Sequence, residues 1–460
     1  MLDLIEEILN KHMRSDVSFI DIRHEVRRFD TVQVINQQLK QISKIYKEGV
    51  AVRALVGESW GFTATTDVSK NSIENALKDA IKIAKSANKS EKQITFDNIP
   101  ITEKEMKPSV KIMPSSIDIE EKTKFAFELN RSLKIDERIV NTNSTIYSAE
   151  YEIDLVNSMG TRLHWPEIRT SVIVSAVARE GERTEFEYNV RAGTLGWEIV
   201  KSIDAEKFTR EPAEGAIELL GAKQAPSGML TVVSDGDISG LLAHEVMGHA
   251  SEADEVVKRR SFLTDMVGKR VGSEFVNMVD DGTMKDAYGS IPFDSEGTPS
   301  SRTVIIENGI YKGYMHSLET ASLMGVKPTG NGRAQDFNRR VFVRMTNTWF
   351  LPGDWNLDEI IADTKDGLLA IKGISGMEDV AGGGVQARAL KGYIIKNGEL
   401  KDLVRGFSIT GKALEILKTV DAVSKEVTGS PGTCGKGEED WVPVTSGGPY
   451  MRAKMVIGGG

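Results

Sequence analysis

Hydrophobic positions in the first hundred residues recur first with the spacing of a helix and then with that of strands. An apolar stripe from Leu2 to Leu9 predicts a short amphipathic helix, and a second stripe predicts a helix over residues 72–86. Between them, β-branched runs interrupted by polar or glycine-containing breaks indicate an antiparallel meander. The runs cover 17–29, 31–35, 41–46 and 49–56, with breaks at Asp30, Gln37-Gln38 and Glu48-Gly49.

A second block follows a polar, proline-containing segment. Residues 88–114 show no hydrophobic period, which predicts a surface connection. A helix is expected from Ser115–Asp118 through Leu133, then strands over 139–200, then a helix over 204–220 that Pro212 starts or kinks. Residues 157–160 and 179–182 have the composition of hairpin turns. This pattern leaves open whether the first 220 residues form one layered structure or two similar units.

The second half is richer in glycine and short β segments. A strand over 225–234 leads into a helix, and two apolar runs, 304–310 and 393–399, each contain the hairpin dipeptide Asn-Gly. Residues 341–349 predict another strand, and residues 412–420 the last helix. We therefore expect an α+β fold, in which an N-terminal α/β region with a mixed or antiparallel sheet and helices precedes a C-terminal β-rich domain carrying a metal-binding helix. The predicted domains are 1–100, 101–222 and 223–460.

Composition narrows the class of protein. The net charge of −9 argues against binding to nucleic acid or to an anionic membrane surface, both of which attract basic proteins. No apolar run reaches 18 residues, and the first residues lack the pattern of a secretion signal. The single cysteine, Cys434, allows no intramolecular disulfide. We expect a cytoplasmic protein that binds neither nucleic acid nor membranes.

The helix after residue 234 carries the strongest chemical signal. It contains His244, Glu245 and His249, and neutral imidazoles are common zinc ligands. The two histidines are five positions apart, not four as in the familiar zinc-protease helix, so a regular helix would turn them about 140° away from each other. We predict one widened turn between them, with Gly248 as the residue most tolerant of this distortion.

The same segment also fits a plain amphipathic helix, because Leu241, Leu242 and Val246 form an apolar stripe. A third ligand would favour the metal-binding interpretation. A lone cysteine is usually a buried hydrophobe, but Cys434 stands between glycines, a threonine and a lysine, in Gly432-Thr-Cys-Gly-Lys436. Two imidazoles and a thiolate leave the fourth position of a tetrahedral zinc open, as in catalytic sites.

Several motifs, in their order along the chain, resemble the TldD/PmbA family, and more closely its TldD branch. The stretch from His244 to Asp254 is similar to the family's His-Glu-x-x-x-His signature with its trailing Glu-Ala-Asp. Further similarity lies in segments that together span nearly the whole chain: 49–53, 60–62, 295–298, 344–348, 352–354 and 432–436.

This resemblance implies a cytoplasmic zinc metallopeptidase that cuts short or unfolded peptides, with a cleft between the subunits of a dimer. His244, His249 and Cys434 would bind zinc, and Glu245 would act as general base. The dimer would be formed by like chains or with a TldE/PmbA-like paralogue. One departure is visible at Gly437–Asp440, which is more acidic than the family's usual Gly-Gln pair and puts any substrate contact of that glutamine in doubt.

Other roles remain open at this point. Glu252 and Asp254 could orient the imidazoles or simply form a solvated helix end, and Arg344 and Asn347 could clamp a peptide or make structural hydrogen bonds. The remaining histidines have no partner pattern. A peptide substrate would most simply add to a sheet edge as an extra strand. Two alternatives stay open: a metal-free hydrolase with Cys434 as nucleophile and His244 or His249 as its base, and a non-catalytic peptide-binding or assembly protein with a structural metal.

Overall fold

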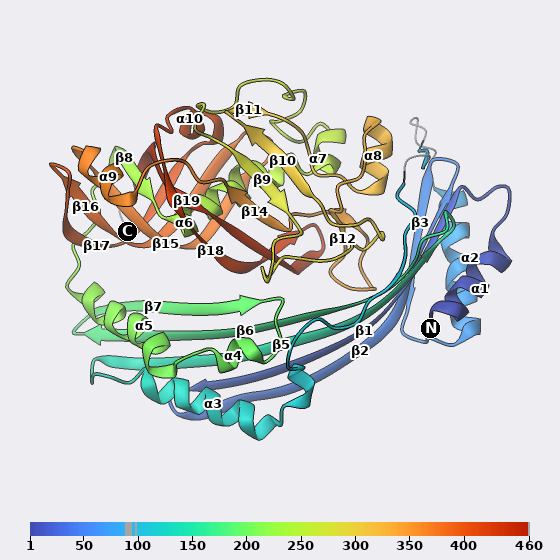
Figure 1. Ribbon diagram of the computed structural model, residues 1–460, viewed down its shortest axis with the longest axis horizontal. Helices are drawn as coiled ribbons and strands as arrows, with labels where there is room; N and C mark the ends of the chain where they lie inside the picture. The colour runs from blue at the N-terminus through green and yellow to red at the C-terminus, as the bar shows by residue number, and fades with distance from the viewer. Residues whose placement is uncertain (88–93, 97–98, 459–460) are drawn as a thin grey trace.

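A strongly curved sheet of seven strands forms the first half of the computed structural model, which describes residues 1–87, 94–96 and 99–458 (Figure 1). The strand order is β3-β2-β1-β5-β6-β4, with β7 beside β6. Neighbouring strands are antiparallel, apart from β4, which is parallel to β6. The strands are β1 (Phe19–Ile35), β2 (Gln38–Val56), β3 (Ser59–Thr65), β4 (Glu103–Glu105), β5 (Ile139–Asn157), β6 (Arg162–Glu180) and β7 (Arg183–Gly193).

Helices cover the outer face of this sheet in two groups, while its inner face is turned toward the second half of the chain (Figure 1). One hydrophobic core joins the first two helices to β1 and β2, and another joins α3 and α5 to β5 and β6. One sheet thus runs through both predicted N-terminal units, although each has its own core. The domain limits at residues 100 and 222 stay predictions. The helices are α1 (Leu2–His12), α2 (Lys70–Ser86), the 3-10 turn η1 (Pro114–Ser116), α3 (Ile119–Ser132), α4 (Glu198–Lys201) and α5 (Ala205–Leu220).

Two of the predicted strand breaks are wrong. β1 continues through Asp30, whose carboxylate forms an ion pair with the buried Lys122 of α3 at 2.5 Å. β2 continues through Gly49, which lies against the ring of Phe337, where a Cβ would come within 2.2 Å. The ladders with β2 and β5 hold β1 through Asp30, and the ladder with β1 holds β2 through Gly49.

Other local predictions for this half are confirmed. The chain reverses at residues 36–37, and the turns after β5 and β6 stand where predicted. Pro212 lies inside α5 and not at its start. The expected connection over 88–114 lies partly outside the described residues, and its described part includes β4 and the start of η1.

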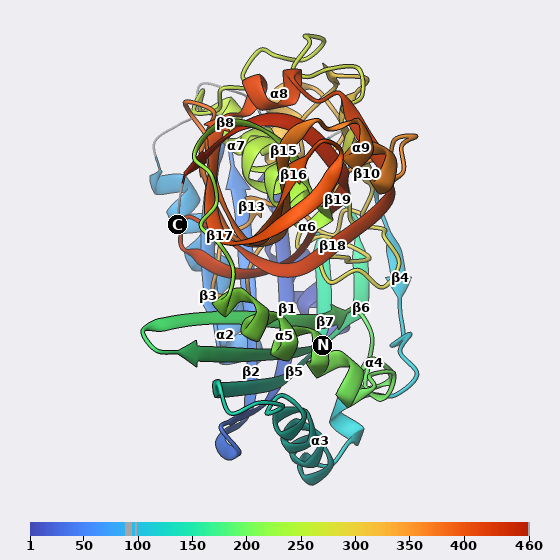
Figure 2. The same cartoon turned by 90° about the vertical axis from the view of Figure 1, so that its left-hand side faces the viewer.

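Strands of the second half of the chain form a closed β-barrel. The strand order is β19-β17-β16-β15-β8, and the ring is closed because β8 also pairs with β19. Figure 2 looks into this barrel and shows helix α6 (Gly236–Leu242) inside it. The helix packs against β15, β16, β18 and β19. The strands are β8 (Gly228–Ser234), β15 (Asp366–Asp379), β16 (Gly384–Lys396), β17 (Glu399–Lys412), β18 (Ala422–Lys436) and β19 (Glu439–Gly458).

The remaining elements are short. Some lie between the barrel and the N-terminal sheet, and others, including the last two helices, pack against barrel strands (Figure 1). Both Asn-Gly pairs form the predicted hairpins, with positive φ at each residue. The strand expected over 341–349 is interrupted, because the N–H of Thr346 donates to the Asp280 carboxylate and not to a neighbouring strand. The elements are β9 (Met278–Asp281), β10 (Arg302–Glu307), β11 (Ile310–Tyr311), α8 (Leu318–Met324), β12 (Gly332–Arg333), β13 (Phe342–Val343), β14 (Asn347–Phe350), α9 (Leu357–Asp363) and α10 (Ala413–Lys418).

The α+β fold class is confirmed, with the histidine-bearing helix inside the β-rich C-terminal half. Over the described residues, no helix has the length and apolar character needed to cross a bilayer.

Candidate metal centre

The histidine-bearing segment enters the barrel directly from β8. Asp235 caps helix α6 by accepting a hydrogen bond from the N–H of Ile238 at 2.9 Å. The helix then widens into a π turn over Ala243–Gly248, followed by a 3-10 turn, η3 (His249–Ser251), and α7 (Ala253–Val257). The predicted widened turn between the two histidines is confirmed.

The wide turn brings the two imidazoles together. The N–H of His249 donates to the carbonyl of His244, five residues back, and the ring centroids lie 5.1 Å apart with the planes 82° to each other. Gly248 serves this geometry for a different reason from the one expected. Its backbone is ordinary helix, but a Cβ there would lie 2.1 Å from the sulfur of Met345. The glycine permits close packing and does not absorb backbone distortion.

Cys434 meets these two rings from the other end of the chain. It lies on β18, opposite Val442 of β19, and its Sγ is 3.4 Å from Nε2 of His249. One donor atom each from His244, His249 and Cys434 lie within 4.8 Å of one another. All three residues are buried. The structure thus gathers the three residues that the sequence singled out as metal ligands.

The Cys434 thiolate and the two imidazolium groups stabilise one another's charges. Burial alone would raise the pKa of the Cys434 thiol, but the two imidazoles outweigh it and hold that pKa well below its usual range. Against the opposing effect of burial, the Cys434 sulfur raises the pKa of His244. The cluster is therefore suited to holding a thiolate.

This donor set fits a zinc ion. Two imidazoles and one thiolate are the ligand types that zinc prefers, and three protein ligands are typical of a catalytic site. Within the described part of the chain, no hydrogen-bond partner meets the buried Nδ1 of His244. Buried polar atoms of this kind are costly unless they are satisfied, which a bound ion and its ligands would help to do.

Glu245 lies beside the cluster and contacts the end of β15, close to the hairpin that joins β15 to β16. Its burial raises its pKa, and a hydrogen bond with Glu378 of β15 adds to this effect. The backbone of Gly376 lies so close that a Cβ would be 2.4 Å from Cγ of Glu245. Sequence reasoning missed Glu378, because it stands near the tip of a hairpin with no motif around it.

A buried carboxylate holds the second imidazole. Oε2 of Glu252 lies 3.1 Å from Nδ1 of His249 and accepts a hydrogen bond from Lys436 Nζ at 3.0 Å. Lys436 also donates to Asp254 Oδ1 at 2.6 Å. Glu252 is 1% exposed, so its interpretation as a solvated helix end is wrong. Glu252 is placed to orient His249, whereas Asp254 contacts Lys436 and the N–H of Glu255.

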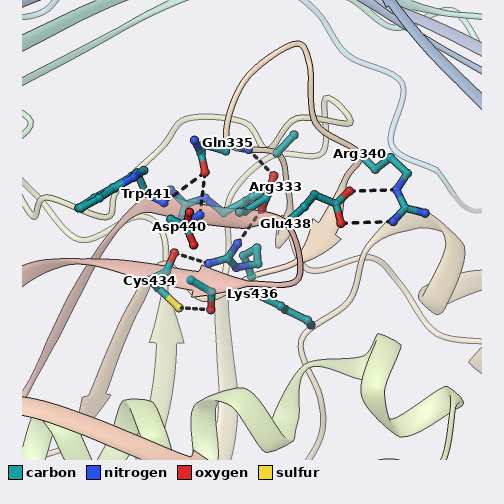
Figure 3. A network of polar contacts seen from close by, with 12 residues as sticks. Arg333, Gln335, Arg340, Cys434, Lys436, Glu438, Asp440 and Trp441 are labelled. Carbon is teal, nitrogen blue, oxygen red and sulfur yellow. Dashed lines mark hydrogen bonds and ion pairs between the residues drawn. The ribbon is translucent and has the colours of Figure 1, made fainter.

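A polar network fastens the hairpin that carries Cys434 (Figure 3). Arg344 donates to the Cys434 carbonyl at 2.5 Å and to Oε2 of Glu439 at 2.6 Å. The side chain of Gln335 accepts from the N–H groups of Asp440 and Trp441. The unusual acidic segment at Gly437–Asp440 therefore belongs to this network.

The two residues for which a peptide clamp and a structural hydrogen bond were both open make structural contacts. Arg344 is fully buried in the contacts above, and the side-chain amide of Asn347 donates to the carbonyl of Asp281 and to Ser290 Oγ. The other four histidines stand outside the cluster, against carboxylates or hydroxyls, as ordinary structural residues: His12, His24, His164 and His316.

Family comparisons agree with these features. Three models of the PmbA/TldA metallopeptidases match the chain: domain 1 at residues 20–84, the central domain at 112–220 and the C-terminal domain at 227–459. Among curated relatives, a metalloprotease of Methanocaldococcus jannaschii is 37% identical over 95% of this chain and 96% of its own. A metalloprotease TldD homolog of Buchnera aphidicola is 32% identical, covering 89% of this chain and 86% of its own. A zinc metalloprotease TldD homolog of Saccharolobus solfataricus is 29% identical, covering 96% and 97%.

Solved structures show the same fold. A Thermotoga maritima protein superposes with a TM-score of 0.81 at 21% identity, and TldE from Thermococcus kodakarensis with 0.77 at 18%. Each pair covers 99% of both chains. The three family models and the relatives that are at least 30% identical show that the chain belongs to the PmbA/TldD family of metallopeptidases, in its TldD branch.

Proposed function

We propose that this protein is a zinc-dependent peptidase that hydrolyses short or unfolded peptides. The observation that carries the proposal is the meeting of two imidazoles and one thiol, distant in sequence, beside a carboxylate on the same helix. His244, His249 and Cys434 would hold the ion. When bound, zinc would polarise the scissile carbonyl and increase the acidity of the attacking water.

Glu245 is the proposed general base. Its carboxylate lies within 4.8 Å of a ring nitrogen of His249 and of the Glu378 carboxylate, so it stands at the edge of the cluster. It would accept the proton of the attacking water and donate it to the leaving amine. Glu378 would share a proton with Glu245 and so keep its carboxylate directed at this edge.

The proposed peptide site is the edge of β15 beside Glu245. β8 pairs with β15 at Leu368–Ala370, and no further strand pairs with this edge within the described residues. Beyond residue 373, this edge leads to Gly376, directly against Glu245. A peptide added here as a strand would be held by its main chain as it passes the base. This mode requires an extended substrate, so compact proteins would be poor substrates.

We further propose a cytoplasmic dimer, of like chains or with a TldE-like paralogue. The reduced thiol needed at Cys434 suits a reducing compartment. TldE from Thermococcus kodakarensis has the same fold, which supports a paralogue as the partner. Mixing with such a paralogue, followed by size and mass analysis, would identify the partner.

The experiment that tests the function compares the zinc-loaded protein with its Glu245→Gln variant on an unstructured fluorogenic peptide. We expect the variant to keep its zinc and to lose about 100-fold or more in kcat, because a general base contributes about that much. Glu255→Gln, on the next helix, is the matched control. Retained hydrolysis in Glu245→Gln would contradict the assignment.

The short distance between Cys434 Sγ and His249 Nε2 also favours a second candidate, a thiol hydrolase that needs no metal. 1,10-Phenanthroline separates the two. It should abolish a zinc peptidase, with activity restored by added zinc, and leave a thiol hydrolase active. A protein that keeps one zinc but cuts no peptide in any assembly would instead be a binding or assembly protein.

A further inference from the structure

A small cavity lies between the inner face of the N-terminal sheet and the loops of the C-terminal half. Its volume is about 40 Å³. Four arginines line it: Arg23 and Arg27 from β1, Arg169 from β6 and Arg333 from β12. All four are less than a tenth exposed, so their charges are removed from bulk water.

The two glutamates of the cavity are already engaged. Glu25 accepts hydrogen bonds from Nε of Arg23 and Nε of Arg27, each at 2.6 Å. Glu167 accepts from Nη1 of Arg169 at 2.7 Å and from the indole N–H of Trp165 at 3.0 Å. These two carboxylates therefore pair with the three arginines of the N-terminal sheet, and neither of them pairs with the fourth arginine, Arg333.

The third carboxylate, Asp294, is held by backbone. One of its oxygens accepts from the N–H groups of Glu296 and Thr298, and the other accepts from that of Gly332, all at 2.9 Å. Asp294 is thus bound within its own loop and the adjoining strand. Even with all three carboxylates ionised, the four guanidinium groups leave the cavity with a positive charge.

Arg333 is the unmatched cation. Its Nη1 donates to the carbonyl of Met345, and no carboxylate lies within ion-pair distance of its guanidinium in the described part of the chain. Burial lowers the pKa of Arg333 to about 10. Arg169 and Arg344 add to the decrease, and Glu167 and Asp280 offset only part of it, but the group remains charged at neutral pH. A buried, uncompensated charge is costly, so a counter-ion at this point would stabilise the fold.

We propose that the cavity binds a small inorganic anion such as chloride, held by the guanidinium of Arg333. The volume admits only a few water-sized groups, which excludes a peptide or a nucleotide. Arg333 ends β12, and the residues that follow it hold the Cys434 hairpin. The N–H of Gln335 donates to Glu439, and the Gln335 side chain accepts from Asp440 and Trp441 (Figure 3). The anion would therefore brace the hairpin that supplies Cys434.

The direct test is bromide. Crystals of the protein grown or soaked in sodium bromide should show an anomalous peak in this cavity, beside Arg333. The absence of a peak there, at a bromide concentration of a few hundred millimolar, would overturn the proposal. This measurement uses the unaltered protein, so it does not depend on whether any variant folds.

Thermal unfolding supplies the second test, with zinc-loaded protein in sodium chloride or sodium gluconate at equal ionic strength. We expect a Tm higher by about 2 °C or more in chloride, because an ion that binds only the folded state stabilises it. Arg333→Met should abolish this difference. The matched control, Arg340→Met, removes an exposed arginine of the same region and should keep it. An equal chloride effect in Arg333→Met, or no effect in the wild-type protein, would overturn the proposal.

Discussion

Replacing Glu252 should weaken zinc binding without unfolding the protein. Glu252 lies 3.1 Å from Nδ1 of His249 and is buried, so its charge supports the imidazole in a medium of low dielectric. Carboxylates in this position typically contribute about 10- to 100-fold to metal affinity, or about 1.4–2.8 kcal/mol. In Glu252→Gln an amide oxygen can still accept from His249 and only the charge is lost, so we expect about 10-fold. In Glu252→Ala both are lost, and we expect a value nearer 100-fold.

The fold should survive these changes because Lys436 keeps its contact with Asp254 at 2.6 Å. Zinc affinity would be measured by competition with a chelating dye, and the metal-free variants would be compared with the wild-type protein by circular dichroism. Glu255→Gln, a carboxylate of α7 that pairs with Lys258, is the control and should bind zinc like the wild type. Unchanged affinity in both Glu252 variants would refute a role for Glu252 in positioning His249.

Two further predictions concern the packing around the site and the buried histidine of the C-terminal half. Gly376→Ala should reduce kcat about 10-fold or more with zinc content unchanged, because its Cβ would lie 2.4 Å from Cγ of Glu245. The control Gly313→Ala, with open space around the added Cβ, should have no effect on kcat. Equal activity of the two variants would count against this packing. Burial lowers the pKa of His316 from 6.5 to about 4, so the folded state binds fewer protons and stability falls as the pH drops from about 6.5 toward 4. Between pH 7 and pH 5, urea unfolding of the wild type should lose about 2 kcal/mol more than that of His316→Gln, whereas parallel losses would exclude His316 as the cause.

The local patterns of the chain predicted much of the fold correctly. The Asn-Gly pairs formed the expected hairpins, and the five-residue spacing of His244 and His249 predicted a wide turn, because only such a turn places both rings on one side. The glycine, threonine and lysine neighbours of Cys434 indicated a third ligand, although no periodicity connects this residue to the histidines.

Features that depend on distant partners could not be predicted. β1 passes through Asp30 because it is paired with both β2 and β5, and position 49 needs glycine because the ring of Phe337 lies against it. The partner of Glu245, Glu378, and the contact between Lys436 and Glu252 likewise appear only when separate strands come together. Hydrophobic spacing reports which face of an element is buried, but it does not report what that face meets.

X-ray absorption at the zinc edge tests the central claim most directly. With one zinc bound per chain, the account predicts one sulfur at about 2.3 Å and two imidazole nitrogens at about 2.0–2.1 Å, with the sulfur lost in Cys434→Ser. A zinc surrounded only by nitrogen and oxygen in the wild-type protein, or a spectrum unchanged in Cys434→Ser, would contradict it.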